Sequence, residues 1–184
     1  MQRMTGLLIG AVFGAVFVVV NAGSPLGAVE STVLRVVACL GAAGVLAMWV
    51  LAVRRGGPRA RPTSAGGRGA MFSPKYAVVV VAEVVLLFGG LRALGALGWP
   101  EQGNVAWVAF VVGAHFVALA PIWRDWSIGV TGAVLTVLGG AGLVMAGVGA
   151  VTWVPFVSGV LSGAVLLGAA LTYGWRGTVR TATV

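Results

Sequence analysis

Long apolar runs make up most of the chain, and short stretches rich in glycine, proline or charged residues separate them. A helix needs about 20 consecutive apolar residues to cross a bilayer, and continuous runs favour helices over the alternating strands of a membrane barrel. The pattern predicts an all-α, polytopic integral membrane protein with six transmembrane helices. We expect these helices at about residues 5–22, 31–53, 76–98, 104–121, 127–148 and 152–173.

The first apolar run has a second interpretation. Arg3, the run itself and the following Asn21-Ala22-Gly23 are also typical of a secretory signal with its cleavage site. The run is long for a signal, and its glycines at positions 6, 10 and 14 share one helix face, where small residues let another helix approach closely. We therefore expect a spanning helix here, with a cleaved signal as the alternative. Gly159 and Gly163 predict the same kind of packing in the last run.

The composition leaves room for little besides membrane helices. Of 184 residues, 59% are hydrophobic and 9% are charged, so the whole chain, 1–184, is expected to form a single membrane domain without a soluble catalytic domain. The lone Cys39 excludes an intrachain disulfide and a cysteine-rich metal site. We expect no metal and no cofactor, because one histidine cannot build a conventional metal site and no nucleotide-binding glycine pattern occurs in the right context.

Basic residues set the expected orientation. Residues 54–75 are rich in Gly, Pro, Arg and Ser, whereas the predicted loops on the other side carry only acidic charges, at Glu30 and Glu101. Because cytoplasmic loops are enriched in Lys and Arg, we expect a disordered basic cytoplasmic linker at 54–75, both termini in the cytoplasm, and a location in the inner (cytoplasmic) membrane of a bacterium. The linker divides the chain into a helix pair and a four-helix block. Its bases should contact anionic lipid headgroups rather than nucleic acid.

Four ionisable residues fall inside the predicted spans, and each is a functional candidate because such groups are costly at bilayer depth. They are Arg35, Glu83, Arg92 and His115. Glu83 is expected about 12 Å and His115 about 9 Å from the cytoplasmic edge, on antiparallel helices joined by a short loop. The two side chains should therefore face each other at one level. Tyr76, seven residues before Glu83 and on the same face, extends a polar track toward the cytoplasm.

The two arginines are expected in a different place. Arg92 lies nine residues from Glu83, which puts it on the opposite face of the helix and about 13 Å higher. We expect it to join Arg35, Glu30 and Glu101 in an outer cluster. One interpretation of this cluster is surface pairing and snorkelling of long side chains, and the other is a binding mouth for an anionic group.

The surroundings of Glu83 suggest its chemistry. A carboxyl group among valines loses hydration, which favours its proton-bearing form, and His115 can orient or reload it. The alternative is a structural hydrogen bond that fixes helix packing. Trp107 lies eight residues from His115, roughly on its side of the helix, and is the aromatic candidate for a cation-stabilising pocket wall. The candidate catalytic residues are thus Glu83 and His115, and the candidate substrate-binding residues are Trp107, Tyr76, Arg92 and Arg35.

One segment resembles a known pattern. The stretch Val112-Gly113-Ala114-His115-Phe116-Val117-Ala118-Leu119-Ala120, followed by Thr131-Gly132, is similar to small six-helix bacterial membrane proteins with Val-Gly-x-His-Phe-x-x-Leu-Ala on one span and Thr-Gly on the next. The resemblance covers about a fifth of the chain, and it implies that His115 belongs to the fold without implying an activity. A looser similarity is to membrane-embedded terpene cyclases, which use acidic proton donors, although no motif of theirs occurs here.

These residues support three hypotheses. The first is proton-initiated cyclisation or isomerisation of a prenyl- or terpenoid-type lipid, with Glu83 as general acid. The second is a small proton-coupled exporter of an apolar compound, with Glu83 as the proton carrier. The third is a non-catalytic membrane scaffold or oligomer subunit held by its glycines. The expected partners are membrane lipids and an apolar small molecule, and a homo-oligomer is left open.

Overall fold

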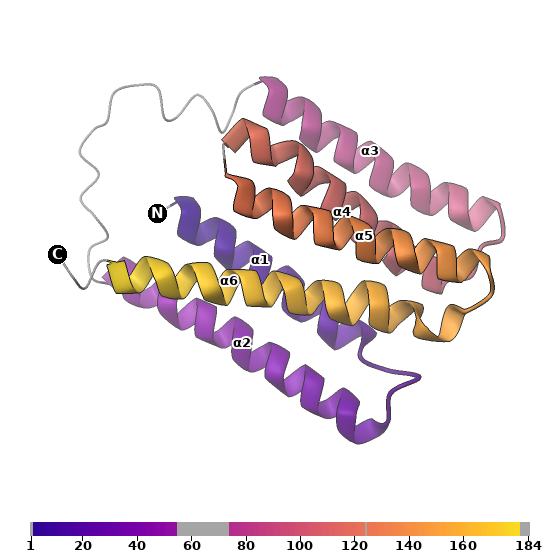
Figure 1. Cartoon of the computed structure of the whole chain (residues 1–184), viewed down its shortest axis with the longest axis horizontal. Helices are drawn as coiled ribbons and strands as arrows, with labels where there is room; N and C mark the ends of the chain where they lie inside the picture. The colour runs from indigo at the N-terminus through magenta and orange to yellow at the C-terminus, as the bar shows by residue number, and fades with distance from the viewer. Residues whose placement is uncertain (1, 55–73, 124, 181–184) are drawn as a thin grey trace. The chain divides into compact units, whose positions relative to one another are not determined.

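The all-helical prediction is confirmed by a computed structural model of the chain, which describes residues 2–54, 74–123 and 125–180. These residues form helices and connecting turns, with no strand among them (Figure 1). The predicted linker at 54–75 lies, apart from its ends, outside the described residues. In order, the helices are α1 (Gln2–Asn21), α2 (Ala28–Arg54), α3 (Pro74–Ala96), α4 (Gln102–Trp123), α5 (Trp126–Gly147), the 3₁₀ turn η1 (Val151–Trp153), the π-helical turn η2 (Pro155–Val160) and α6 (Leu161–Arg180).

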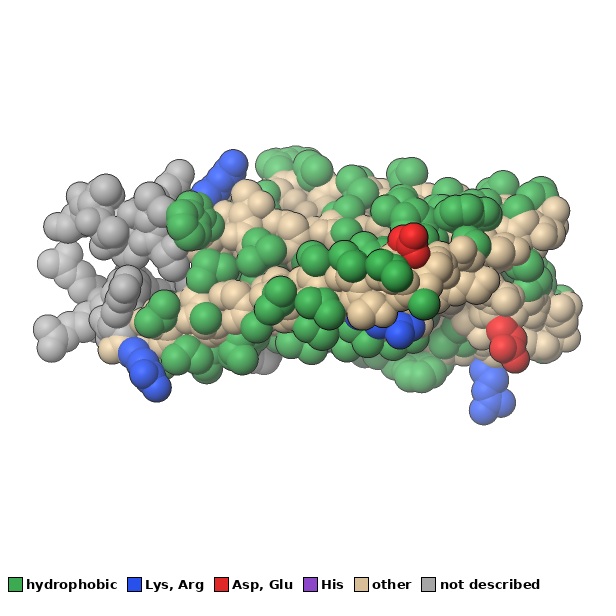
Figure 2. Space-filling model, turned by 90° about the horizontal axis from the view of Figure 1, so that it is seen from below, with side chains coloured by type: hydrophobic (Ala, Val, Ile, Leu, Met, Phe, Trp, Pro, Cys, Tyr) green, Lys and Arg blue, Asp and Glu red, His purple; other side chains and the backbone are tan. Residues whose placement is uncertain are grey.

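Five helical stretches are long and apolar enough to cross a membrane, which makes this a multi-pass membrane protein. They correspond to α2, α3, α4, α5 and the continuous stretch from η1 into α6, while the apolar part of α1 runs from Gly6 to Asn21. Large hydrophobic side chains are exposed along these helices, and charged groups are sparse between them (Figure 2). Such a surface suits hydrocarbon rather than water.

Contacts group the helices into two compact units, divided at Val160. One unit holds α1, α2 and α6, and the other holds α3, α4 and α5. The expected division into a helix pair and a four-helix block is therefore wrong, because α6 packs against α1 and α2 and joins the first pair (Figure 1). The single membrane domain stays a prediction.

In the first unit, α1 and α6 meet through two glycines. A Cβ atom built on Gly163 would lie 2.5 Å from the Gly14 carbonyl oxygen and 2.8 Å from Val18 Cγ2, so only a hydrogen fits there. Of the predicted glycine face on α1, Gly14 makes this contact, whereas Gly6 and Gly10 have nothing within 4 Å of an added Cβ. The four-residue spacing identified the face of the helix but not the depth of the contact.

We expect Gly163→Ala to lower the stability of the protein in detergent by about 1 kcal/mol, because the new methyl group would force α1 and α6 apart. Gly168→Ala is the matched control, since it lies on the same helix with nothing within 4 Å of its added Cβ. Both variants gain the same helix propensity from alanine, so the difference between their unfolding midpoints isolates the steric cost. Equal midpoints would contradict the contact.

The helices α2 and α6 lie side by side and run in the same direction. Gly41 of α2 faces Leu167 of α6, and three residues further on Gly44 faces Leu171, both at 3.7 Å between an added Cβ and a leucine methyl carbon. Near their ends Met48 covers Gly174. Along these contacts the residue numbers increase in the same direction on both helices, so α2 and α6 are parallel.

In the second unit, α4 and α5 form the closest helix pair. Gly113 of α4 and Gly132 of α5 touch each other's backbones, since an added Cβ on either would lie 2.7 Å from the carbonyl oxygen of the other. Gly139 of α5 lies equally close to the backbone at Phe110 and Ala106. As residue numbers rise on one helix they fall on the other, so the pair is antiparallel. Small residues allow this approach in lipid.

The helix α3 is the most peripheral element of this unit. None of the apolar residues between Tyr76 and Ala96 is buried, and α4 is its main neighbour. Gly98 ends the helix with a φ of +66°, and Gly149 follows α5 with a φ of +83°. Both angles lie in the left-handed region that glycine adopts without strain. Two of the breaks expected from the sequence therefore have a defined backbone cause.

Candidate functional site

The contact between α3 and α4 is a ladder of three rungs. Successive rungs are seven residues apart on α3 and eight apart on α4, which is about two helical turns, or 11–12 Å, each. The two helices are antiparallel, so residue numbers increase along α3 as they decrease along α4. The three contacts are Tyr76 with Trp123, Glu83 with His115, and Gly90 with Trp107.

The middle rung holds the two predicted catalytic residues. His115 Nδ1 lies 3.0 Å from Glu83 Oε2, and this is the one contact between an acidic and a basic side chain within salt-bridge distance among the described residues. The side chain of His115 is 11% exposed and that of Glu83 is 23% exposed. The structure therefore brings a carboxyl and an imidazole together, shields them on most sides, and leaves the carboxyl partly open at the surface of the helix pair.

The contact is a close approach rather than an aligned hydrogen bond. His115 Nδ1 is buried and makes no hydrogen bond of good geometry to any described residue, although the carboxylate oxygen lies within reach. A small rotation of either side chain would align the donor with the oxygen, because both are held at hydrogen-bonding distance. The two atoms are therefore placed for a direct acid–base contact.

Trp107 forms the contact with Gly90 at one end of the ladder. Its Nε1 donates a hydrogen bond of 3.1 Å to the carbonyl oxygen of Leu86, and its ring lies on Gly90, where any side chain would overlap it. The ring also stacks on Phe110, with centroids 5.9 Å apart. Trp107 thus faces α3, as His115 does, but its indole is fixed to the α3 backbone. Its predicted role as a pocket wall stays a prediction.

The opposite rung is an aromatic pair that includes a residue not singled out from the sequence. Tyr76 and Trp123 stack with ring centroids 6.3 Å apart and an interplanar angle of 24°. The buried Trp123 Nε1 has no hydrogen-bond partner among the described residues. The spacing along α4 could have indicated this contact, since Trp123 lies eight residues after His115, as Trp107 lies eight before it. A tryptophan at a helix end is more often part of an interfacial belt.

The predicted outer cluster is not assembled within either unit. Arg35 is exposed on α2 and donates a hydrogen bond of 3.1 Å from Nε to the carbonyl oxygen of Val19, which ties α2 to α1. Arg92 is exposed on α3. The two arginines belong to different units, so a joint binding mouth stays a prediction.

Hydroxyl groups elsewhere in the second unit are directed at the backbone. Thr131 and Thr136 donate to the carbonyl oxygens of Ser127 and Gly132 on their own helix, and Ser158 donates across to the carbonyl of Leu138 at 2.9 Å. These groups satisfy the backbone rather than face a polar ligand. No group of three His, Cys, Asp or Glu side chains converges within the described ranges to hold a metal ion.

Comparisons of the chain with protein-family models, with curated proteins and with solved structures find no match. The function proposed below therefore depends on the geometry of the Glu83–His115 contact and its surroundings.

Proposed function

We propose that the protein is a small proton-coupled carrier of an apolar compound. Glu83 gains and loses the transported proton, and His115 exchanges it with the carboxyl group. The observation that carries the proposal is the 3.0 Å contact between Glu83 Oε2 and His115 Nδ1, between two helices that are long and apolar enough to cross a membrane. Ionisable side chains in such a position commonly belong to ion or proton pathways.

The number of protons held by the pair determines its charge. With one proton, the pair is neutral overall, either as carboxylic acid with imidazole or as carboxylate with imidazolium. Removing that proton leaves one negative charge, and adding another leaves one positive charge. Both states are costly in hydrocarbon. A carrier can use this cost, because the neutral pair with one proton tolerates a position between the helices that the deprotonated, negatively charged pair does not.

The side chains of the second unit favour an apolar cargo. The hydroxyl groups of Thr131, Thr136 and Ser158 are engaged with backbone carbonyls, so a hydrophilic solute would find few partners among them. The residues flanking Glu83 on α3 are valines, leucines and one alanine, Ala82. An apolar compound that enters from the bilayer fits this environment and can reach the exposed edge of the carboxyl group.

α3 is the element best placed to move. It has no buried residue and α4 is its main neighbour, so few packing contacts resist a displacement. The Glu83–His115 contact lies between the two helices, which means that its protonation can favour or disfavour their association. We infer that a change in proton number shifts α3 relative to α4 and alters access to the carboxyl group.

The proposal includes a topology. We place six spans in a bacterial cytoplasmic membrane, with α1 as the sixth, both termini in the cytoplasm and the basic 54–75 segment on the same side. The antiparallel pairing of α3 with α4 and of α4 with α5 agrees with alternating spans. The parallel course of α2 and α6 agrees as well, since both would run toward the cytoplasm.

The enzyme hypothesis is the second candidate, because the partly exposed carboxyl of Glu83 is open to contact by a prenyl chain from the bilayer. In that case the acid would protonate a carbon–carbon double bond, and cyclisation or isomerisation would end with loss of a proton to His115. Trp107 supports this less well, because its ring lies on Gly90, about two turns from His115.

Two assays, one in sealed liposomes and one in detergent, distinguish the carrier from the enzyme. Full-length protein is reconstituted in liposomes with an imposed pH gradient, and movement of the apolar fluorophore N-phenylnaphthylamine is followed together with internal pH. A carrier moves the probe only while the gradient lasts. In parallel, protein in detergent is incubated with farnesol and geranylgeraniol, and the extracts are analysed for new products. Conversion in detergent without gradient-driven movement would overturn the carrier proposal in favour of the enzyme. If the protein shows neither gradient-driven movement nor conversion, the scaffold hypothesis is the one that stands.

A further inference from the structure

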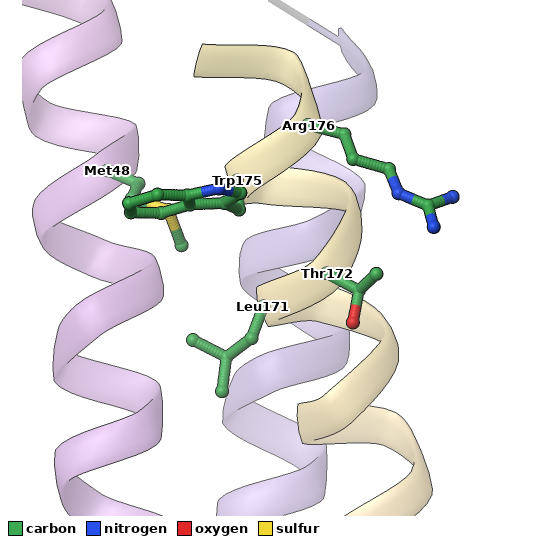
Figure 3. A pocket seen from close by; sticks show the side chains of 5 residues that line it. All are labelled: Met48, Leu171, Thr172, Trp175 and Arg176. Atoms are coloured by element: carbon green, nitrogen blue, oxygen red, sulfur yellow. The ribbon is translucent and has the colours of Figure 1, made fainter. Parts of the chain in front are cut away.

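A groove at the far end of α2 and α6 lies in the first unit and has no part in the Glu83–His115 contact. It is a shallow, open groove of about 410 Å³ and is lined by Met48, Leu171, Thr172, Trp175 and Arg176 (Figure 3). Met48, Leu171 and Trp175 gather on one side of α6, and Thr172 and Arg176 project on the other (Figure 3). The groove therefore combines an apolar wall with a hydroxyl and a guanidinium one helical turn apart.

The order of these groups along α6 matches the order of groups in a phospholipid. Arg176 lies nearest the end of the helix, and Leu171 lies five residues, or about 7.5 Å, deeper in the apolar stretch. Met48 covers Gly174 and adds a flexible apolar surface beside Leu171. Trp175 is exposed at the level of the charge, which is typical of the membrane–water interface.

The charge at this end of the unit is unopposed by acidic residues. The chain has four acidic side chains, and the one in this unit, Glu30, lies in the first turn of α2. That position is 18 residues, or about 27 Å, from Met48. Arg54, the last residue of α2, adds a second positive charge at the same end. Arg176 makes no ion pair within the described ranges.

We propose that this groove binds an acidic phospholipid. The phosphate pairs with the Arg176 guanidinium, and an acyl chain lies against Met48 and Leu171. Thr172 Oγ1 donates to the carbonyl oxygen of Gly168 at 2.7 Å, so its remaining lone pairs accept a hydrogen bond from a headgroup hydroxyl. The apolar wall selects a lipid rather than free phosphate, and the guanidinium selects an acidic over a zwitterionic headgroup.

Native mass spectrometry of the detergent-solubilised full chain tests the site. We expect one dioleoyl-phosphatidylglycerol to bind in preference to dioleoyl-phosphatidylcholine, by about fivefold, the effect of one basic residue near a lipid surface. Arg176→Gln should abolish this preference, and Arg176→Lys should retain most of it because the charge remains. Inorganic phosphate alone should neither bind nor compete.

Arg54→Gln is the matched control, because it removes the same charge from the same end without altering the lining of the groove. It should change the preference less than twofold. An equal loss in Arg54→Gln and Arg176→Gln would show diffuse attraction of acidic lipid and overturn the site. An unchanged preference in Arg176→Gln, or competition by free phosphate, would overturn it as well. Unfolding midpoints of the variants, measured in the same detergent, ensure that only folded protein is compared.

Discussion

Replacing Glu83 by glutamine is expected to lower the rate of gradient-driven probe movement at least about 100-fold, the usual contribution of a positioned proton-transfer group. The amide has nearly the same size and shape as the carboxylic acid and can remain 3.0 Å from His115 Nδ1. It cannot bind or release a proton at neutral pH. The helix contact is thus preserved while the proton-carrying group is lost. The measurement is the initial rate of N-phenylnaphthylamine movement in proteoliposomes with an imposed pH gradient.

Two exposed carboxylates provide the controls for this result. Glu30→Gln and Glu101→Gln each remove one acidic group from an exposed position and should keep close to the full rate. Glu83→Gln should unfold at nearly the same detergent concentration as the original protein. A full rate in Glu83→Gln would refute the proton-carrier role. A rate lost together with the fold would mean that the contact serves packing alone.

His115 should act with Glu83 as one unit. If the proton passes between Oε2 and Nδ1, removing either group interrupts the same step. Glu83→Gln and the double variant with His115→Gln should therefore be about equally slow, because losses within one functional unit do not add. Multiplied losses in the double variant would show that the two residues work in separate steps.

The approach of Glu83 to His115 could be predicted because local rules were sufficient. A short loop makes α3 and α4 antiparallel neighbours, and the rise of 1.5 Å per residue gives each side chain a depth. Charged and proline-containing breaks provided the reference points at the helix ends. The stacking of Tyr76 on Trp123 follows from the same arithmetic. The sequence alone does not single it out, because a tryptophan at a helix end is more often part of an interfacial belt.

The grouping of α6 with α1 and α2 could not be predicted in this way. Helices that are hydrophobic on all sides have no polar face to indicate which side meets a neighbour. Small residues then decide the contacts, and a glycine spacing shows a helix face but neither the partner nor the depth. Gly14 and Gly163 meet although 148 positions separate them in the chain, whereas Gly6 and Gly10 of the same face meet nothing. Long-range pairing of this kind requires the three-dimensional arrangement.

Replacing Gly139 by alanine is expected to be the most destabilising single methyl addition in the second unit, lowering the free energy of unfolding by about 1–3 kcal/mol. An added Cβ would lie 2.6 Å from Phe110 Cα and 2.8 Å from the Ala106 carbonyl oxygen. Both are backbone atoms of α4, so no side chain can rotate away and the helices must separate. The free energy of unfolding can be measured by titrating dodecyl maltoside micelles with sodium dodecyl sulfate and following the loss of helical circular dichroism.

Gly140→Ala is the adjacent control. Its added Cβ would meet only Phe110 Cδ2, at an ordinary contact distance of 3.9 Å. Both substitutions lie in the middle of α5 and gain the same helix propensity, which by itself favours alanine. Gly140→Ala should therefore be neutral or slightly stabilising, and the gap between the two variants gives the cost of separating α4 from α5. Because His115 and the Gly113–Gly132 contact share α4, Gly139→Ala should also slow probe movement while leaving Glu83 intact. If Gly139→Ala and Gly140→Ala unfolded alike, the close α4–α5 contact would be wrong.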